Sequence, residues 1–206
     1  MEFTIVIPAY NEGKSIGKVL AAIEQAVSDA EVIVVDDCST DDTVQVASQF
    51  SHVRVIKQST NGGPIEAIAT GIVNASHDVV VTIDADGQHP VASIHDVVRP
   101  ILNDQADIVL GVRNSLPRLG EKIIARFSGV SDATTGFKAM RKTEVENFKD
   151  DTAYGGMLLV KEKRLGKRIA EVPITVRERE EGVSVHSNYN ILKKSIRFAY
   201  WALFKK

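Results

Sequence analysis

The sequence lacks the features that mark several common classes of protein. It has one cysteine, Cys38, among 206 residues, so no internal disulfide framework can form and a reducing compartment suits the chain. No uncharged run approaches the roughly 18–20 residues that a membrane-spanning helix needs. The formal net charge of −2 argues against nucleic acid as a partner. No basic segment precedes the short apolar N-terminal run, so a signal peptide is not expected.

Apolar, β-branched runs in the first half predict strands that are buried on both faces of a sheet. These runs cover residues 3–7, 31–35, 53–56, 79–83 and 108–112. Apolar residues at helical spacing lie between them, at residues 16–27, 65–73 and 94–101. Strands that alternate with helices predict right-handed crossovers and a mostly parallel, Rossmann-like α/β sheet.

The pattern loosens after Val112. The composition predicts a polar loop, two further helices and two further strands, with the last strand interrupted at Pro173. These segments are residues 113–117, 119–127, 136–141, 154–165 and 168–176. We find no linker or internal repeat, and a single domain over residues 1–206 is the simplest interpretation.

Acidic side chains follow three of the predicted strands. Glu12 comes after the first strand, Asp36 and Asp37 after the second, and Asp84 and Asp86 after the fourth. Ligands of open α/β sheets bind beyond the carboxyl ends of the strands. Helix capping could account for any one of these aspartates. Several carboxylates at one rim repel each other unless a cation or hydrogen-bond donors offset them, which favours a binding site.

The triplet Asp84-Ala85-Asp86 is the sharpest of these signals. Alternation along an extended chain would turn both carboxylates the same way, towards one site. Hard oxygen ligands suit Mg²⁺ or Mn²⁺, which take few protein carboxylates and complete their shell with water and phosphate oxygens. Gln88 could supply a further neutral oxygen. We therefore expect Asp84, Asp86 and Gln88 to bind a metal that offsets charge on a diphosphate leaving group.

Four motifs, in this order along the chain, resemble those of family-2 glycosyltransferases with the GT-A fold. They are VIPAYNE (6–12), VVDDCSTD (34–41), DADGQHP (84–90) and DATTGF (132–137). The branch that the sequence resembles most is that of the dolichyl-phosphate mannose synthases and their polyprenyl-phosphate relatives. The resemblance implies a nucleotide-sugar-binding half over residues 1–112, a smaller acceptor-side half over 113–185, and a C-terminal amphipathic helix over 186–206.

The resemblance also implies roles for residues of the first half. In such enzymes the positions of Pro8, Tyr10 and Glu12 hold the nucleotide base and ribose. Asp37 would contact the base or ribose edge, and Val35 would line the same pocket.

Residues 84–86, with Ala85 between the two acids, would meet the donor diphosphate. Arg113 matches a basic residue that meets donor or acceptor phosphate, and Arg177 or Arg179 matches a phosphate-binding arginine. The sequence leaves open which of these two it is, and each could equally be a solvated surface charge. Asp86, Arg113 and Asp132 are the expected catalytic residues.

One departure from the family pattern bears on the acceptor. Met157 stands where the relatives carry a glutamate, and no acid replaces it. A hydroxyl acceptor needs a base to take its proton, whereas a phosphate monoester is already anionic near neutral pH. The expected activity is therefore inverting transfer of mannose or glucose from GDP-mannose or UDP-glucose to a polyprenyl or dolichyl phosphate. Asp132 is the reserve candidate for a base, although it could simply cap the turn before Gly136.

Two alternatives stay open at this point. The chain could transfer sugar to a saccharide or protein hydroxyl. It could also bind a nucleotide sugar with little turnover, because Met157 replaces an acid and residues 113–132 form a short acceptor-side segment.

The C-terminal segment predicts an amphipathic helix. One stripe at helical spacing consists of Leu192, Ile196, Ala199 and Leu203. The other side combines Tyr200, Trp201 and Phe204 with Lys193, Lys194 and Arg197. Aromatic and cationic residues together suit phospholipid headgroups, although a helix docked on the domain with solvated lysines fits as well. We expect a cytoplasmic protein that can lie peripherally on the cytoplasmic face of a membrane.

Overall fold

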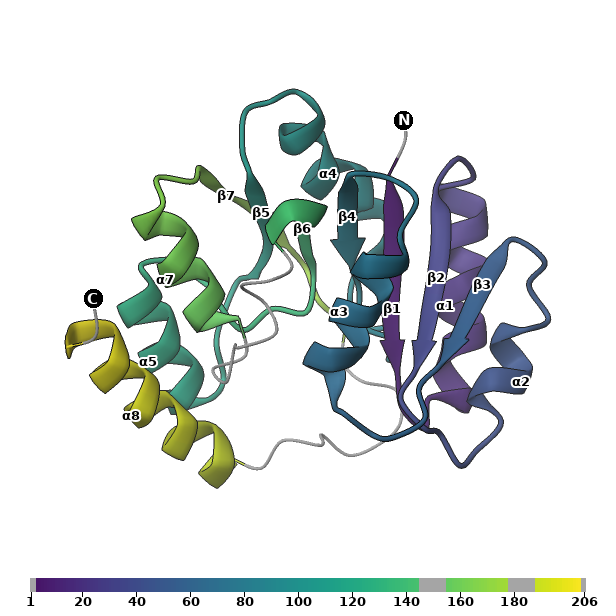
Figure 1. The fold of residues 1–206 in the computed structure, drawn as a ribbon, viewed down its shortest axis with the longest axis horizontal. Helices are drawn as coiled ribbons and strands as arrows, with labels where there is room; N and C mark the ends of the chain where they lie inside the picture. The colour runs from purple at the N-terminus through teal and green to yellow at the C-terminus, as the bar shows by residue number, and fades with distance from the viewer. Residues whose placement is uncertain (1–2, 145–154, 178–187, 205–206) are drawn as a thin grey trace.

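The computed structural model has a seven-stranded sheet with helices on both faces (Figure 1). It describes residues 3–144, 155–177 and 188–204. The strand order is β3-β2-β1-β4-β6-β5-β7, and β6 runs antiparallel to both of its neighbours while the other pairs are parallel. The predicted fold class, a mostly parallel α/β sheet of the GT-A type, is confirmed.

The predicted strands and helices are present with ends that differ by a few residues. The strands are β1 (Thr4–Ala9), β2 (Glu31–Asp36), β3 (Val53–Lys57), β4 (Val79–Thr82), β5 (Ile108–Arg113), β6 (Lys138–Arg141) and β7 (Ile169–Ile174). The helices are α1 (Gly13–Ala26), α2 (Thr43–Ala47), α3 (Pro64–Asn74), α4 (Ile94–Leu102), α5 (Leu119–Ser128), α7 (Gly156–Arg164) and α8 (Asn188–Phe204). Short 3-10 turns lie at Val91–Ser93 and Lys142–Glu144.

Alternation along the strands divides the core into two layers. Ile5 and Ile7 of β1 are fully buried on the side covered by α1, α2 and α4. Val6 points to the other side and packs with α3, in the layer that also contains α5, α7 and α8. Burying each such aliphatic side chain contributes roughly 1.5–3 kcal/mol relative to leaving it exposed. Both faces of the sheet are therefore covered, as the continuous apolar strands predict.

The predicted interruption at Pro173 is wrong. Strand β7 continues through this residue, and Pro173 pairs in register with Val112 of β5. Strand β7 is the last in the strand order, and edge strands tolerate proline because an outward-facing N–H forms no ladder bond.

The strand order reverses direction between β1 and β4. The chain leaves β1 towards β2 on one side, and β4 returns on the other side of β1. Strand β4 pairs with β1 only as far as Val6, whereas β2 pairs with it as far as Ala9. Pro8 thus lies where β1 and β4 separate. This is the topological switch point at which open α/β sheets bind their ligands.

The C-terminal helix α8 docks by a face that the sequence pattern did not single out. Ile191, Ser195 and Phe198 are buried against the domain, whereas Ile196 and Leu203 of the predicted stripe are 59% and 62% exposed. Trp201 does not lie on the exposed side of α8 with Tyr200 and Phe204. Its ring stacks on Phe198, and the Arg164 guanidinium carbon lies 5.3 Å from the centre of the Trp201 ring. No helix within the described ranges is both long and apolar enough to cross a bilayer.

Gly71 sets the spacing between α3 and the sheet, so an added methyl group should destabilise the protein. A Cβ at this position would overlap the side chain of Val6, which is fully buried. We predict that Gly71→Ala lowers the free energy of unfolding by about 1–3 kcal/mol, measured by urea denaturation. Gly17→Ala is the matched control, since Gly17 also lies within a helix but its Cβ would stand 3.1 Å from Val46. Equal losses in the two variants would contradict this account of helix packing.

Candidate active site

The loops that follow β1 and β2 are tied together at the rim of the sheet. The Asn11 N–H donates to Ser39 Oγ at 2.9 Å, and the Thr40 N–H donates to Asn11 Oδ1 at 2.8 Å. Asn11 has a left-handed φ of 55°, which asparagine tolerates better than most residues. The turn places Tyr10, 42% exposed, and Glu12 at the end of β1, close to the switch point.

Asp37 and Val35 have structural partners at this rim. The Asp37 carboxylate accepts hydrogen bonds from the N–H groups of Gly62 and Gly63, both at 2.8 Å, and is 3% exposed. It therefore holds the loop that leads into α3. The Val35 side chain is fully buried in the apolar cluster beneath α3, next to Gly71.

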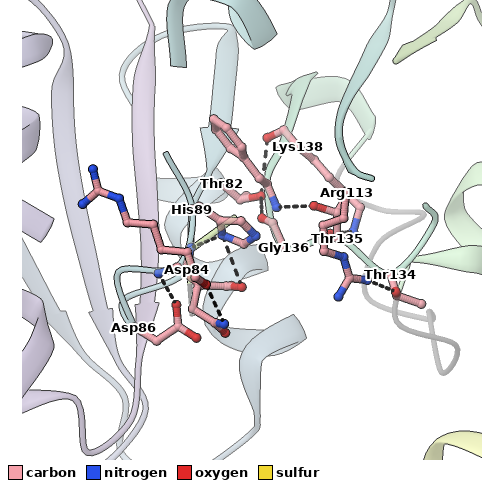
Figure 2. A network of polar contacts seen from close by, with 12 residues as sticks. Thr82, Asp84, Asp86, His89, Arg113, Thr134, Thr135, Gly136 and Lys138 are labelled. Carbon is pink, nitrogen blue, oxygen red and sulfur yellow. Dashed lines mark hydrogen bonds and ion pairs between the residues drawn. The ribbon is translucent and has the colours of Figure 1, made fainter. Parts of the chain in front are cut away.

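Asp84 lies where the end of β4 meets the chain before β6 (Figure 2). Its carboxylate rests against the Cα of Gly136 so closely that a side chain at Gly136 would overlap it. His89 Nδ1 is 3.5 Å from Asp84 Oδ2, and the His89 ring packs on Phe137 with ring centres 5.6 Å apart. His89 is buried, while the Asp84 side chain stays 42% exposed. The surroundings thus fix this carboxylate and leave it accessible.

Asp86 and Arg177 are brought to one loop although they are far apart in the sequence. The Gln88 N–H donates to Asp86 Oδ1 at 3.0 Å. The Arg177 N–H donates to the Gln88 carbonyl at 2.9 Å, and Gln88 Nε2 donates to the Arg177 carbonyl at 3.2 Å. Asp86, Arg177 and Glu12 contribute to the wall of a pocket of about 610 Å³ beside α1. Arg179 lies outside the described residues.

The two acids of the triplet do not continue the alternation of β4. The strand ends at Thr82, and the chain turns at residues 85–86, so Asp84 and Asp86 have different protein neighbours. The extended geometry expected from the sequence is therefore wrong. No group of three or more His, Cys, Asp or Glu side chains gathers as metal ligands in the part of the chain that the structure describes. Two carboxylates on one loop still suit Mg²⁺ or Mn²⁺, provided that phosphate oxygens complete the shell.

Arg113, at the end of β5, and Asp132 form a two-pronged ion pair. Arg113 Nε donates to Asp132 Oδ2 at 2.6 Å, and Arg113 Nη2 donates to Asp132 Oδ1 at 3.0 Å and to Thr134 Oγ1 at 2.9 Å. Asp132 is fully buried, and the Arg113 side chain is 20% exposed. Glu121 at the start of α5 lies 3.7 Å from Arg113 Nη1. One arginine is thus held by two buried carboxylates.

These contacts shift the pKa of both partners. Burial alone would raise the pKa of Asp132, but the hydrogen bonds and charge of Arg113 outweigh it and hold the pKa below its usual value. Burial alone would lower the pKa of Arg113, but Asp132, Glu121 and Asp84 together raise it. Asp132 is therefore ionised but fully occupied, which makes it a poor proton acceptor.

Sequence patterns did not single out Glu121 or the contact between Gly136 and Asp84. Glu121 is the sole acid of the predicted helix over residues 119–127, and this is the one feature of the sequence that could have drawn attention to it. The contact of Gly136 with Asp84 joins segments that are 52 positions apart along the sequence, so local patterns carry no trace of it.

A family model agrees with this fold and rim. Residues 4–146 match the model described as glycosyl transferase family 2. The match extends from β1 beyond β6 and includes the four motifs and the rim that they form. The chain therefore belongs to glycosyl transferase family 2, and it is an enzyme of the sugar-transferring class.

Named relatives and one solved structure resemble the chain over most of its length. The chain is 31% identical to a dolichyl-phosphate hexose transferase of Haloferax volcanii, over 86% of this chain and 84% of that protein. It is 30% identical to a dolichol-phosphate mannosyltransferase of Pyrococcus furiosus, over 89% of this chain but 59% of that longer protein. The fold matches the glucosyl-3-phosphoglycerate synthase of Mycobacterium tuberculosis, in a complex with Mn²⁺, UDP and phosphoglyceric acid, with a TM-score of 0.77. That match covers 96% of this chain and 78% of that chain at 23% identity, which supports the GT-A fold alone.

The Arg113–Asp132 pair should make stability depend on pH in a defined direction. Because the pKa of Asp132 is lowered on folding, its ionised form stabilises the fold above the ordinary carboxyl pKa of about 3.9. This contribution is lost as the pH falls through the lowered value. We predict that Asp132→Asn costs about 3 kcal/mol at neutral pH, since Arg113 is left largely buried without the closer of its two counter-charges. Urea denaturation should show the gap between wild type and variant narrowing as the pH falls; a gap that widens would contradict the assignment.

Gly136 should be essential for the position of Asp84. Gly136→Ala would push the Asp84 carboxylate aside without imposing a left-handed φ, because Gly136 is not among the residues with positive φ. We predict that glycosyl transfer falls about 100-fold while the unfolding midpoint changes little. Gly17→Ala serves as the control and should keep its activity. Full activity of Gly136→Ala would show that the site does not depend on this position of Asp84.

Proposed function

We propose that the protein is an inverting glycosyltransferase that moves a hexose, mannose or glucose, from a nucleoside diphosphate sugar to a polyprenyl or dolichyl phosphate. GDP-mannose and UDP-glucose are the donors that we infer. The observation that carries the proposal is that the two carboxylates next to Arg113, Asp132 and Glu121, are buried and paired with it, so neither is available as a base. Within the described residues, Asp132 is committed to Arg113, and the first turn of α7, where Met157 stands, carries no acid.

An acceptor that brings its own negative charge removes the need for a base. A phosphate monoester has a second pKa of about 6 and is largely dianionic at neutral pH. A hydroxyl acceptor would have to lose a proton to a side chain during attack. The occupied state of Asp132 therefore favours a phosphate nucleophile over a saccharide or protein hydroxyl.

The names of the relatives support the same acceptor class. Proteins named for transfer to dolichyl, undecaprenyl and polyprenol phosphates match this chain along most of its length. They include an undecaprenyl-phosphate mannosyltransferase of Micrococcus luteus, 29% identical over 98% of this chain. One of these names gives only a hexose and the other two give mannose, so the choice between mannose and glucose for this chain rests on the donor experiment below.

On the donor side we assign Pro8, Tyr10, Glu12 and the loop held by Asp37 to the nucleoside. Asp84, Ala85 and Asp86 face the diphosphate in this proposal. Arg177, which is tied to the same loop through Gln88, adds a positive charge beside it. Arg179 is the other candidate for that role. Residues 1–112 would form the donor half and 113–185 the acceptor half.

Asp86, Asp84 and the amide oxygen of Gln88 would hold Mg²⁺ or Mn²⁺ together with oxygens of the donor. The amide nitrogen of Gln88 is committed to the Arg177 carbonyl, so its oxygen is the atom available as a ligand. When bound, such an ion offsets the charge that develops on the leaving diphosphate.

The reaction forms one bond and breaks one. An oxygen of the acceptor phosphate attacks the anomeric carbon in line with the donor linkage. The bond from that carbon to the diphosphate breaks, and the electron pair leaves with the nucleoside diphosphate. Arg113, fixed by Asp132 and Thr134, lies on the acceptor side and holds the incoming phosphate by charge. A single displacement inverts the configuration at the anomeric carbon.

Asp84→Asn and Asp86→Asn test this assignment. Each replacement keeps the shape of the side chain but removes a negative charge from the diphosphate region. We predict that each lowers transfer by about 100-fold or more, measured as nucleoside diphosphate release with a panel of nucleotide sugars and polyprenyl phosphate. Asp96→Asn is the matched control, because Asp96 is an exposed acid on α4 that pairs only with Arg99 among the contacts recorded for it.

Full activity in either variant would contradict the proposed mechanism. If the wild type binds the donor but releases no nucleoside diphosphate when polyprenyl phosphate is supplied, the protein is a binding protein with little turnover. That result would contradict the proposed transfer reaction but not the proposed donor site.

A further inference from the structure

Helix α8 has a second apolar face that nothing in the described part of the chain covers. Ile196, Tyr200, Leu203 and Phe204 are 59%, 64%, 62% and 69% exposed. Their spacing of four, seven and eight positions places them on one side of the helix. Four of the nine exposed large apolar side chains in the described part of the chain thus gather on one helix. We call these four residues the outer stripe.

The outer stripe is ordered and separate from the face that docks α8 on the domain. Ile191 and Phe198 of the docked face are 3% and 2% exposed. Tyr200 and Phe204 pack their rings against each other, with centres 5.0 Å apart. Figure 1 shows α8 at the margin of the molecule, with α5 and α7 on its inner side.

The charge around the outer stripe has one sign. Lys193, Lys194 and Arg197 are exposed on the same helix. Residues 188–206 contain five lysines and arginines and no acid, whereas the whole chain has a net charge of −2. A positive, apolar helix face complements a surface that is anionic at its border and apolar beneath it.

We propose that α8 lies parallel to the surface of a membrane that contains anionic phospholipids, with the outer stripe facing the lipid. The apolar side chains of the stripe enter the boundary between headgroups and acyl chains, and the lysine and arginine side chains of α8 contact the headgroup phosphates. This inference rests on the proposed function, because it names the surface from which a lipid phosphate acceptor is drawn. A second copy of the chain is disfavoured as the occupant, since an isologous contact would oppose two helices of the same positive charge.

The surface is connected to the acceptor side of the site by direct packing. Gly120 of α5 is so close to α8 that a Cβ there would stand 2.7 Å from the Ile191 side chain. The next residue of α5, Glu121, lies beside Arg113. A membrane-bound α8 therefore holds the start of α5, and with it the arginine that we assign to the acceptor phosphate, near the lipid surface.

Vesicle flotation of the full chain tests the proposal without donor or acceptor. The wild type should bind phosphatidylcholine vesicles that contain phosphatidylglycerol. Ile196→Ser with Leu203→Ser should weaken this binding about tenfold or more, because two apolar side chains no longer enter the bilayer. Val73→Ser is the matched control, since Val73 is 58% exposed on α3, and it should bind as the wild type does. Circular dichroism and unfolding midpoints verify that each variant is folded.

A charge variant separates the two components of binding. Lys193→Gln, Lys194→Gln and Arg197→Gln together should lose about fivefold per cation on vesicles with phosphatidylglycerol. The same variant should bind pure phosphatidylcholine as the wild type does. No binding by the wild type would overturn the proposal, and so would equal losses for Val73→Ser and for the double variant with Ile196→Ser and Leu203→Ser. A wild-type dimer in sedimentation velocity that the stripe variant dissociates would also overturn it, in favour of a second copy.

Activity on a short, water-soluble polyprenyl phosphate keeps the two proposals apart. Stripe variants should retain transfer to this acceptor and lose transfer to a vesicle-embedded one. Vesicle binding without transfer to either acceptor would overturn the proposed function and leave the membrane surface standing. Transfer to the soluble acceptor without vesicle binding would do the reverse.

Discussion

The ion pair between Arg113 and Asp132 is the interaction on which the site depends. It joins the end of β5 to the turn before β6. Strand β6 lies between β4 and β5 and runs antiparallel to both, so the turn that precedes it lies at the same rim as the end of β5. Strand β6 in turn follows Gly136, against which Asp84 rests. Breaking the pair would leave a charge with little access to water and would loosen the link between the end of β5 and the turn before β6.

Much of the fold is predictable because burial on both faces leaves continuous apolar runs. Residues 31–35 and 108–112 became β2 and β5 almost unchanged. Pro173 was misjudged, since tolerance for proline depends on a strand's place at the edge, which is a property of the whole sheet. The bend after Asp84 was missed for a related reason. The Asp84 carboxylate before this bend lies against His89 and Gly136, and the latter is distant in the sequence.

Helix α8 illustrates a different limit of sequence patterns. Periodicity locates apolar positions, but α8 has two apolar faces, and the pattern favoured the stripe with Leu192, Ile196, Ala199 and Leu203. The face that docks is chosen by its neighbours, among them Gly120, which lets Ile191 approach α5 closely, and Gly156, which lies against Phe198. Which apolar side chains form the exposed outer stripe therefore depends on how α8 docks, and helical periodicity alone does not determine it. The roles of Tyr10, Glu12 and Arg177 as donor contacts stay predictions.

In the proposed reaction the acceptor already carries a negative charge, so no catalytic base is needed to generate the nucleophile. The most direct measurement compares a polyprenyl phosphate with the free polyprenol of the same chain length, as acceptors for one donor, with Asp132 and Arg113 intact. We predict that sugar is transferred to the phosphate and not detectably to the alcohol, and that the product is a sugar phosphodiester of inverted anomeric configuration. Comparable transfer to the alcohol would contradict it.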